Sequence, residues 1–491
     1  MATLGYGAWD LHFPPGPPDL IAEMVATAVV ADAVRRYDAD LAQSVETCRE
    51  WRRAYRRVFR GMTALAASSP DASRGIARDG LRAVRATLNY TAGQSVRPLS
   101  AVDPAELGTD QPWVETGEVA GEAKPERRLE VRVGGERLSG DRLRRQLRDW
   151  RRRGILEPDF ATRIERVIDH PEWLALPGFR AVLAGADAEL SPLRPLLRWG
   201  ADVLAFDLPS RRRWRDRARE GAGRLRFPVL SGRPGADLAA HLPAVVRWID
   251  GELGDGIRPV LGLYAAAAGP AGLRLAAAAD LLADAVSRRH PNTALAYPGS
   301  PFDCYAVPRD VFADARERRA RLGMLGTAQD CVRVLSGGSA FRPNYRHEIA
   351  DAAGARWGVA DLLPPPLGPN HALAHRLPRW RALLAHAGGQ TVSYSVTPLV
   401  WGRIARTAWP VAAYRGCTHF GIEVFEPDTA RTLLAAELVA DLFDPPAAEP
   451  NPESLFASGA CHSGLWRLPY EHRSLLTFAA AAGRLQRLLP V

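Results

Sequence analysis

The sequence has almost no lysine: Lys124 is the only one among 64 lysine and arginine residues. It lies in the stretch GEVAGEAKPERR, which is typical of a loop. Phosphate-binding loops, Schiff-base enzymes and the Tyr-x-x-x-Lys pair of short-chain dehydrogenases all need a well-placed lysine. We therefore expect none of these chemistries, and the net charge of +9 is carried by arginine.

Cysteine is also scarce, with five residues scattered along the 491-residue chain. Their spacing matches no metal-ligand pattern, so no metal site is predicted. An odd number of scattered cysteines indicates free thiols in a reducing compartment. Cys461 and His462 are adjacent in sequence and do not predict a thiol–imidazole pair, because neighbouring side chains usually diverge.

Long apolar runs are absent as well. The most apolar helix-like stretch, 273–286, is interrupted by Arg274, Asp280 and Asp284. The N-terminus lacks a basic start followed by an apolar core, so we expect a cytoplasmic protein with no membrane partner. The arginine clusters lie on charge-mixed, helix-like segments without an aromatic platform, which favours solvated helix faces over nucleic-acid binding.

The stretch FRAVLAGADAELSPLRPLLRWGADVLAFD organises the rest of the chain. Residues 179–184 form an apolar run that enters Gly185, the form of a buried parallel strand. A proline opens and a glycine closes the helix that follows, and 203–206 is a second strand. Asp207 lies 22 residues after Gly185, where mononucleotide-binding units keep the acid that holds a ribose. This unit predicts the start of a Rossmann-like half.

The loop departs from the dinucleotide fingerprint G-x-G-x-x-G, because Asp187 and Leu190 replace its second and third glycines. Glu189 adds a negative charge near a helix N-terminus, where it competes with an anionic ligand. Three alternatives follow: a nucleotide bound with altered geometry, S-adenosylmethionine, which has no phosphate, or a fold that has lost its ligand. Arg211 would hold the 2′-phosphate of NADP and Asp207 would repel it, so NAD is favoured over NADP.

Strands alternating with helices continue along the chain, with strands expected at 225–230, 259–264 and 293–297. The predicted fold class is therefore α/β, a Rossmann-like parallel sheet core with a helical N-terminal domain and an α/β C-terminal extension. The boundaries that we expect are 1–175 for the mostly helical domain, 176–310 for the core and 311–491 for a C-terminal substrate or cap region. Within the first of these, 96–127 has the composition of a long loop, and Gly134-Gly135 is typical of a hairpin turn.

Ligands of such sheets lie beyond the carboxyl ends of the strands. Tyr264 ends the fourth strand, and the stretch after the fifth places Asp303 and Tyr305 near a substrate as an acid–base couple. The alternative is a turn that Asp303 caps. His419 and His462 are candidates for a second wall of the cleft, or for buried structural histidines.

One further histidine pair, His371 and His375, has the spacing of one helix face. No third ligand accompanies the pair, so we expect a solvated helix rather than a metal site.

Four stretches resemble a family of large Rossmann-like proteins from actinobacteria and photosynthetic eukaryotes. They are AGADAELSPLRPLLRWGADVLAFDLPSRRRW, TALAYPGSPFDCYAVP, AAYRGCTHFGIEVFEPDTARTLLAAELVADL and SGACHSGLWRLPY. The resemblance covers roughly residues 138–475 and implies the fold and domain order, but no reaction. This chain departs from it in reading YAAAAGP where members carry an acid, and SVTPLVWGR where they carry basic and amide groups. We expect a site remodelled to be more apolar, as in a specialised protein of secondary metabolism.

The leading hypothesis is an NAD(P)-dependent oxidoreductase acting on an apolar or polyketide-like small molecule. Asp207 would bind the ribose, Gly185 would permit the turn, and Tyr305 with Asp303 or Tyr264 would handle protons. The alternatives are a cyclase or isomerase that uses no cofactor, an S-adenosylmethionine-dependent methyltransferase, and a non-catalytic binding protein. A homodimer is compatible with each of these hypotheses.

Overall fold

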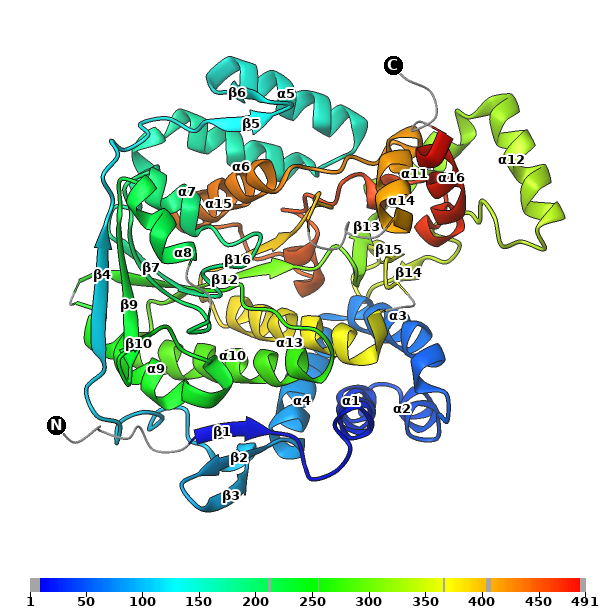
Figure 1. Ribbon diagram of the computed structural model, residues 1–491. Coiled ribbons are helices and arrows are strands. Elements are labelled where there is room, and N and C mark those ends of the chain that lie inside the picture. The colour runs from blue at the N-terminus through cyan, green and yellow to red at the C-terminus, as the bar shows by residue number, and fades with distance from the viewer. Residues whose placement is uncertain (1–8, 211–212, 255, 365–366, 403–407, 486–491) are drawn as a thin grey trace.

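A central sheet of eight strands forms the middle layer of the protein (Figure 1). The computed structural model describes residues 9–210, 213–254, 256–364, 367–402 and 408–485. The strands of this sheet are β4 (Glu115–Ala120), β7 (Phe179–Ala184), β8 (Asp202–Phe206), β9 (Arg224–Leu230), β10 (Arg233–Pro234), β11 (Arg258–Leu263), β12 (Ala294–Gly299) and β16 (Val392–Val396).

Six of these strands are parallel and lie in the order β9-β8-β7-β11-β12-β16. The chain enters at the centre with β7, moves outward to β9, returns to place β11 beside β7, and then moves outward in the other direction. β7 and β11 are paired along their full length, from Phe179 with Arg258 to Ala184 with Leu263. The strand order therefore reverses between β7 and β11, the position at which sheets of this kind bind ligands.

The strands are apolar on both faces: Val182, Leu183, Leu204 and Leu261 are fully buried. A parallel sheet of this composition must be covered on both faces. The helices α9 (Leu238–Glu252), α10 (Gly269–Arg289) and α13 (Gly368–Ala387) cover one face, and α6 (Pro158–Asp169), α7 (Leu193–Arg198) and α15 (Pro427–Phe443) cover the other (Figure 1). The structure is thus mixed α/β with a mostly parallel central sheet, and all five strands predicted from the sequence are present.

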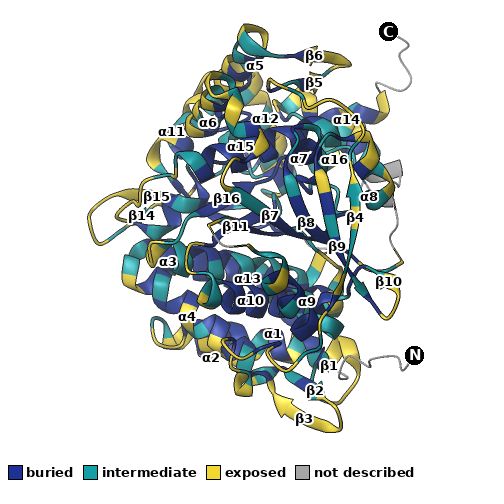
Figure 2. Cartoon of the chain, turned by 90° about the vertical axis from the view of Figure 1, so that its left-hand side faces the viewer, coloured by how far each residue is buried: buried dark blue, intermediate teal, exposed yellow. Residues whose placement is uncertain are grey.

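The N-terminal helices form an additional layer against α10 and α13 (Figure 1). They are α1 (Pro18–Val34), α2 (Ala39–Glu46), α3 (Trp51–Ser68) and α4 (Pro70–Thr87), and a small sheet of β1 (Trp9–His12), β2 (Asn89–Ala92) and β3 (Ser95–Pro98) flanks them. Figure 2 shows α10 and α13 as largely buried elements between this layer and the sheet. No helix in the described part of the chain is long and apolar enough to cross a membrane.

The three segments expected from the sequence all contribute to the central sheet. β4 lies within 96–127, where a loop was predicted, and pairs antiparallel with β9. That prediction was wrong for 115–120, because a half-exposed edge strand has no apolar run to mark it. β16 lies well beyond 310 and completes the opposite edge of the central sheet.

The hairpin of β5 (Val131–Val133) and β6 (Glu136–Leu138) turns at Gly134-Gly135 as predicted, and α5 (Gly140–Arg153) follows it.

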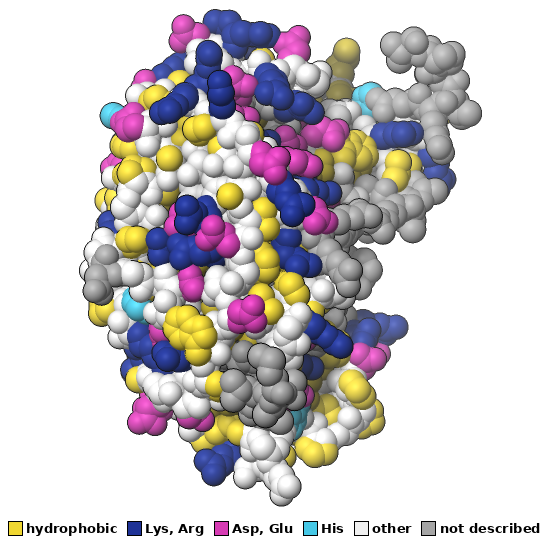
Figure 3. Space-filling view, turned by 60° about the vertical axis from the view of Figure 1, so that its left-hand side comes forward, with side chains coloured by type: hydrophobic (Ala, Val, Ile, Leu, Met, Phe, Trp, Pro, Cys, Tyr) yellow, Lys and Arg dark blue, Asp and Glu magenta, His cyan; other side chains and the backbone are white. Residues whose placement is uncertain are grey.

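The C-terminal region adds smaller units beside the sheet. A three-stranded antiparallel sheet contains β13 (Cys304–Pro308), β14 (Ile349–Ala350) and β15 (Arg356–Asp361), and the helices are α11 (Arg309–Ala320), α12 (Gly323–Leu335), α14 (Ala408–Cys417) and α16 (Leu476–Leu485). The last two helices pack against each other. Basic and acidic side chains are interspersed on the face drawn in Figure 3, without a uniform basic patch.

A buried ionic network connects these units. Arg376 and Arg379 on α13 lie 2.7 and 3.5 Å from the carboxylate of Asp303, at the start of β13. Arg379 also bonds Glu453, which accepts a 2.8 Å hydrogen bond from Ser73 on α4. These charged side chains are 1–4% exposed. Asp303 is therefore held by two guanidinium groups inside the protein, which corrects its predicted place beside a substrate.

We predict that Asp303→Ala lowers the free energy of unfolding by roughly 3–5 kcal/mol, because it leaves the buried guanidinium of Arg376 without its carboxylate and that of Arg379 with Glu453 alone. Tyr305→Phe removes one hydroxyl, which donates to the Ser300 carbonyl at 2.7 Å, and costs about 1 kcal/mol. Urea denaturation followed by circular dichroism measures both. Unchanged stability of the Asp303 variant would contradict the structural role.

Candidate functional site

A cavity of about 570 Å³, here called cavity A, opens at the carboxyl ends of β7 and β8. Its walls come from the loops that follow four strands: Gly185, Ala188 and Glu189 after β7, Phe206 to Leu208 at the end of β8, Ala236 to Ala239 after β9, and Ala265 to Ala268 with Ala271, Arg274 and Leu275 after β11. These loops meet because the strand order reverses there.

Gly185 sets the distance between the two central loops. Its φ is +87°, and a Cβ atom on it would lie 2.4 Å from the backbone nitrogen of Ala265. Both facts require glycine. The N–H groups of Gly185 and Ala186 donate to the carbonyl of Phe206 at 3.0 and 3.1 Å. The turn after β7 is thereby fixed against the ends of β8 and β11.

Asp207 follows β8 directly and lines cavity A with 9% of its surface exposed. One carboxylate oxygen accepts the backbone N–H of Asp187 at 2.8 Å, and the other accepts that of Leu208 at 2.8 Å. The backbone thus holds the carboxylate in a defined orientation at the cavity wall.

Glu189, rather than Asp187, is the loop acid that lines cavity A. Asp187 instead lines a separate hollow of about 170 Å³, together with Arg194, Arg217 and Arg431. Asp187 is thus absent from the lining of cavity A, and its place relative to a cofactor phosphate stays a prediction. The carbonyl of Glu189 accepts two bonds from Arg431, at 2.7 and 3.1 Å, which fix this part of the loop.

The charges around cavity A are mostly negative. Glu189, Asp207 and Asp237 line it, and Asp237 also caps α9 by accepting the N–H of Ala239 at 3.0 Å. Arg274 is the basic side chain in the lining, and it pairs with Asp10 at 2.7 Å. Such a lining favours a neutral or cationic ligand group over an anionic one. Arg211, predicted to bind a cofactor phosphate, lies outside the described residues.

A second cavity of about 300 Å³, cavity B, lies on the other side of the reversal and shares Ala188, Glu189 and Ala266 with cavity A. Its remaining lining is Leu190, Tyr264, Pro298 to Phe302, Leu367, His371, His375, Thr397 to Val400, Gly402 and Tyr414. Most of these side chains are apolar.

Tyr264, which was predicted to end this strand, directly follows β11 and lines cavity B. Burial raises the pKa of its phenol, and the charge of nearby Glu437 raises it further. The phenol is therefore protonated at neutral pH and is a hydrogen-bond donor rather than a base.

His371 and His375, on the first turns of α13, form the most polar part of cavity B. Their rings lie 4.3 Å apart in an edge-to-face arrangement. Burial lowers the pKa of His371 to about 3, aided by the neighbouring His375, whose own pKa burial also lowers. Both rings are neutral at pH 7. The Nε2 atom of His371 is buried and has no hydrogen-bond partner among the described residues.

The sequence prediction of a solvated helix for this pair was wrong. The spacing of four residues was the available signal, but the neighbouring Leu373 and Leu377, both fully buried, show that this part of the helix faces inward. Among the described residues, no group of three or more His, Cys, Asp or Glu side chains is arranged to hold a metal ion.

Tyr305, His419 and His462, which were also predicted as site residues, line neither cavity A nor cavity B. Tyr305 is fully buried, and its hydroxyl donates to Ser300 rather than facing cavity B. His419 lies in an apolar groove beside α12.

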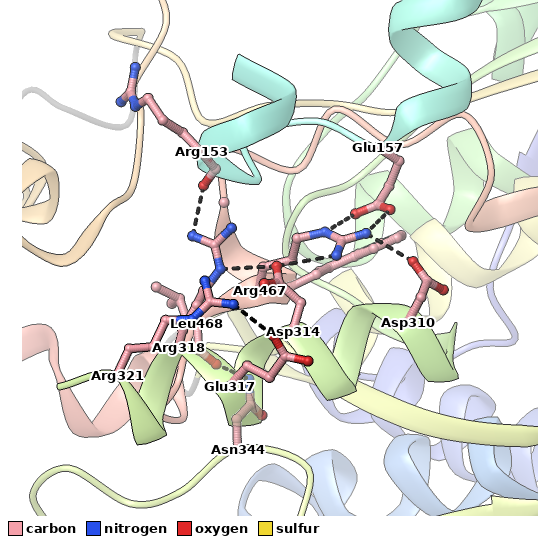
Figure 4. Close-up of polar contacts among 12 residues, drawn as sticks. Arg153, Glu157, Asp310, Asp314, Glu317, Arg318, Arg321, Asn344, Arg467 and Leu468 are labelled. Atoms are coloured by element: carbon pink, nitrogen blue, oxygen red, sulfur yellow. Dashed lines mark hydrogen bonds and ion pairs between the residues drawn. The ribbon is translucent and has the colours of Figure 1, made fainter. Parts of the chain in front are cut away.

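His462 is fully buried: its Nδ1 accepts the N–H of Gly464 at 3.2 Å, and its Nε2 therefore donates to Glu157 at 2.8 Å. Glu157 is also held by Arg467, which reaches Asp310 and Asp314 (Figure 4). The His462 ring is therefore held by hydrogen bonds to Gly464 and Glu157, and its role is structural.

A buried acid pair lies behind cavity B, on α15. Arg163 is 3.1 Å from Glu437 and 3.3 Å from Asp441, and Asp441 also accepts a 2.7 Å hydrogen bond from Ser393 on β16. Burial and the charge of Asp441 raise the pKa of Glu437 to about 8, and burial also raises the pKa of Asp441. One arginine thus faces two carboxylates, and the pair retains a proton near neutral pH.

Comparison of the chain with protein-family models, with curated proteins and with solved structures finds no match in any of the three. The functional argument therefore rests on the geometry of cavities A and B.

The raised pKa of Glu437 predicts a pH dependence of stability. The folded protein binds a proton that the unfolded chain releases near its ordinary pKa of 4.5, so this contribution to stability is lost as the pH rises towards about 8. We expect Glu437→Gln to flatten the decline in unfolding free energy across that interval, measured by urea denaturation at several pH values. The exposed acid variant Glu220→Gln is the control, and an equal slope in both variants would contradict the assignment.

Proposed function

We propose that this protein is an enzyme that binds an NAD-type dinucleotide across cavities A and B and transfers hydride to or from an apolar small molecule in cavity B. The observation that carries the proposal is the position of Asp207 at the end of β8, beside Gly185 and the reversal of strand order. In order of appearance along the chain, the parallel strands lie 3-2-1-4-5-6, the arrangement of Rossmann dinucleotide-binding folds.

The two cavities match the two halves of such a cofactor. Cavity A, beside β7, β8 and β9, would hold the adenosine half, with the Asp207 carboxylate accepting bonds from the ribose hydroxyls. Cavity B, beside β11, β12 and β16, would hold the nicotinamide half and the substrate. The pyrophosphate would cross at the shared residues Ala188, Glu189 and Ala266. Asp207 would repel a 2′-phosphate, which favours NAD over NADP.

At the substrate end, His371 and Tyr264 would handle protons; Tyr264 was expected from the sequence, and His371 would take the place of Tyr305 and Asp303. When hydride transfer between the nicotinamide and a substrate carbon interconverts an alcohol and a carbonyl, a proton also moves at the substrate oxygen. His371 is neutral, and its Nε2 has no hydrogen-bond partner among the described residues, so it would bond that oxygen directly. Tyr264 supplies a protonated phenol in the same cavity. The remaining apolar lining favours a substrate with few polar groups.

A second candidate is an S-adenosylmethionine-dependent methyltransferase. The observation in its favour is the acidic lining of cavity A, where Glu189 would face a cationic sulfonium rather than a pyrophosphate. The helix after the loop, α7, has six residues. Because it is so short, its dipole attracts a phosphate group only weakly. Asp207 would hold the ribose of either ligand.

The first experiment is a titration of the purified protein with NADH, NADPH and S-adenosylmethionine by calorimetry and native mass spectrometry. We expect saturable NADH binding that Asp207→Ala weakens about 100-fold, since a charge-assisted bond to each hydroxyl is worth roughly 1.5–3 kcal/mol. Glu220→Gln, on the exposed surface, should bind as the wild type does.

Glu189→Gln separates the two ligand classes. Removing this charge should tighten NADH binding and weaken the binding of S-adenosylmethionine, because one ligand is anionic near the loop and the other cationic. Binding of S-adenosylmethionine alone would replace the oxidoreductase proposal with the methyltransferase. Failure of all three ligands to bind would reject both and favour a reaction without a cofactor.

His371→Phe tests the proton-handling role. We expect it to retain NADH binding and to lower turnover of alkyl and aryl ketones by about 100-fold or more, followed through NADH absorbance. His347→Phe, which changes an exposed histidine that lines neither cavity, is the matched control. Wild-type turnover by the His371 variant would exclude this histidine from the reaction.

A further inference from the structure

Helix α12 (Gly323–Leu335) extends away from the rest of the protein (Figure 1). None of its residues is buried. Met324 is 90% exposed, Leu335 87%, Val334 71% and Leu325 57%. Most large apolar side chains elsewhere are covered, so this concentration on one short helix marks a contact surface.

The inner side of α12 faces the body of the protein. Leu325, Gln329 and Val332 line an apolar groove of about 630 Å³ between the helix and the C-terminal region, and Ala328, which is exposed, lies at the edge of this groove next to the outer side of the helix. Phe341, Phe420, Leu468, Tyr470 and Phe478 line the opposite wall. The groove lies along one side of the helix, and the apolar side chains on the outer side remain exposed to solvent.

The outer stripe is Met324, Ala328, Cys331 and Leu335, at the spacing i, i+4, i+7 and i+11. This is the spacing of a helix seam that packs against another helix. Cys331, in the middle of the stripe, is exposed.

The stripe is symmetric about a point between residues 329 and 330. Its two large residues, Met324 and Leu335, are equally distant from that point, and so are its two small residues, Ala328 and Cys331. An antiparallel copy of the same helix would place Met324 against Leu335 and Ala328 against Cys331. The small residues at the centre would allow the helices to approach closely. This is the self-complementarity that a two-fold contact requires.

The charges on α12 are compatible with such a contact. Asp330 and Arg333 are its charged residues, and they lie 3.2 Å apart. Asp330 also pairs with Arg319 of α11 at 2.7 Å. The helix is therefore electrically balanced, and a second copy would meet no like charge along the stripe.

We propose that α12 is the contact surface of a homodimer, in which the α12 helices of two copies pack antiparallel about a two-fold axis. A helix of 13 residues is about 20 Å long. Two of them bury less than the roughly 1,200–2,000 Å² of a stable interface. The dimer is therefore concentration-dependent, and its existence is independent of what cavities A and B bind.

Sedimentation velocity of the full chain over a wide concentration range tests the dimer. The wild type is expected to shift from monomer to dimer, while Met324→Arg and Leu335→Arg stay monomeric at every concentration. The matched control is Val96→Arg on β3, which changes another exposed apolar residue, 61% exposed, and should dimerise as the wild type does. A wild type that stays monomeric, or a dimer that persists in both arginine variants, overturns the proposal.

Cross-linking tests the antiparallel register. In Ala328→Cys, the new thiol would lie against Cys331 of the second copy, so mild oxidation should give a covalent dimer on a non-reducing gel. Adding Cys331→Ser should abolish that dimer. Arg333→Cys, on the opposite face of the helix, should give none. Equal cross-linking through residues 328 and 333 would exclude this packing.

Discussion

A parallel sheet buried on both faces is the constraint on which the rest of this structure depends. Its strands are apolar on each side, so helices must cover both faces. The carboxyl ends of the strands are where backbone and side-chain polar groups emerge together. Because the strand order reverses between β7 and β11, their loops diverge there and leave cavities A and B.

The electrostatics of these cavities differ from what the strand order alone suggests. The order favours a dinucleotide, whereas Glu189, Asp207 and Asp237 give cavity A a negative lining. A ligand held here would depend on its ribose hydroxyls and on apolar contact with the alanine-rich loop after β11, with little attraction for phosphate. Cavity B is mainly apolar, and its histidines are neutral because burial disfavours their charged forms.

Several side chains that looked chemically suggestive in the sequence instead have structural partners. Asp303 bonds two arginines that lie more than seventy residues further along the chain. His462 bonds Glu157, which lies in the N-terminal part. Such groups are expensive to bury alone, so their partners must be supplied by folding. Short-range sequence patterns carry no information about partners at that distance.

The sequence by itself determined the local elements of the fold and part of the site. The five strands, the hairpin at Gly134-Gly135, the glycine turn at Gly185 and the position of Asp207 follow from patterns spanning a few residues. These are decided by apolar runs, by φ preference and by the distance from one strand end to the next.

Only the tertiary structure decided how these elements are combined. It added β4 and β16 to the edges of the sheet, placed Asp187 in the hollow beside α7 and Glu189 at the boundary of cavities A and B, and placed His371 at cavity B. It also left the apolar residues of α12 exposed. The physical reason is that burial and ion pairing depend on segments hundreds of residues apart, whose contact is set by the strand order and not by any local pattern.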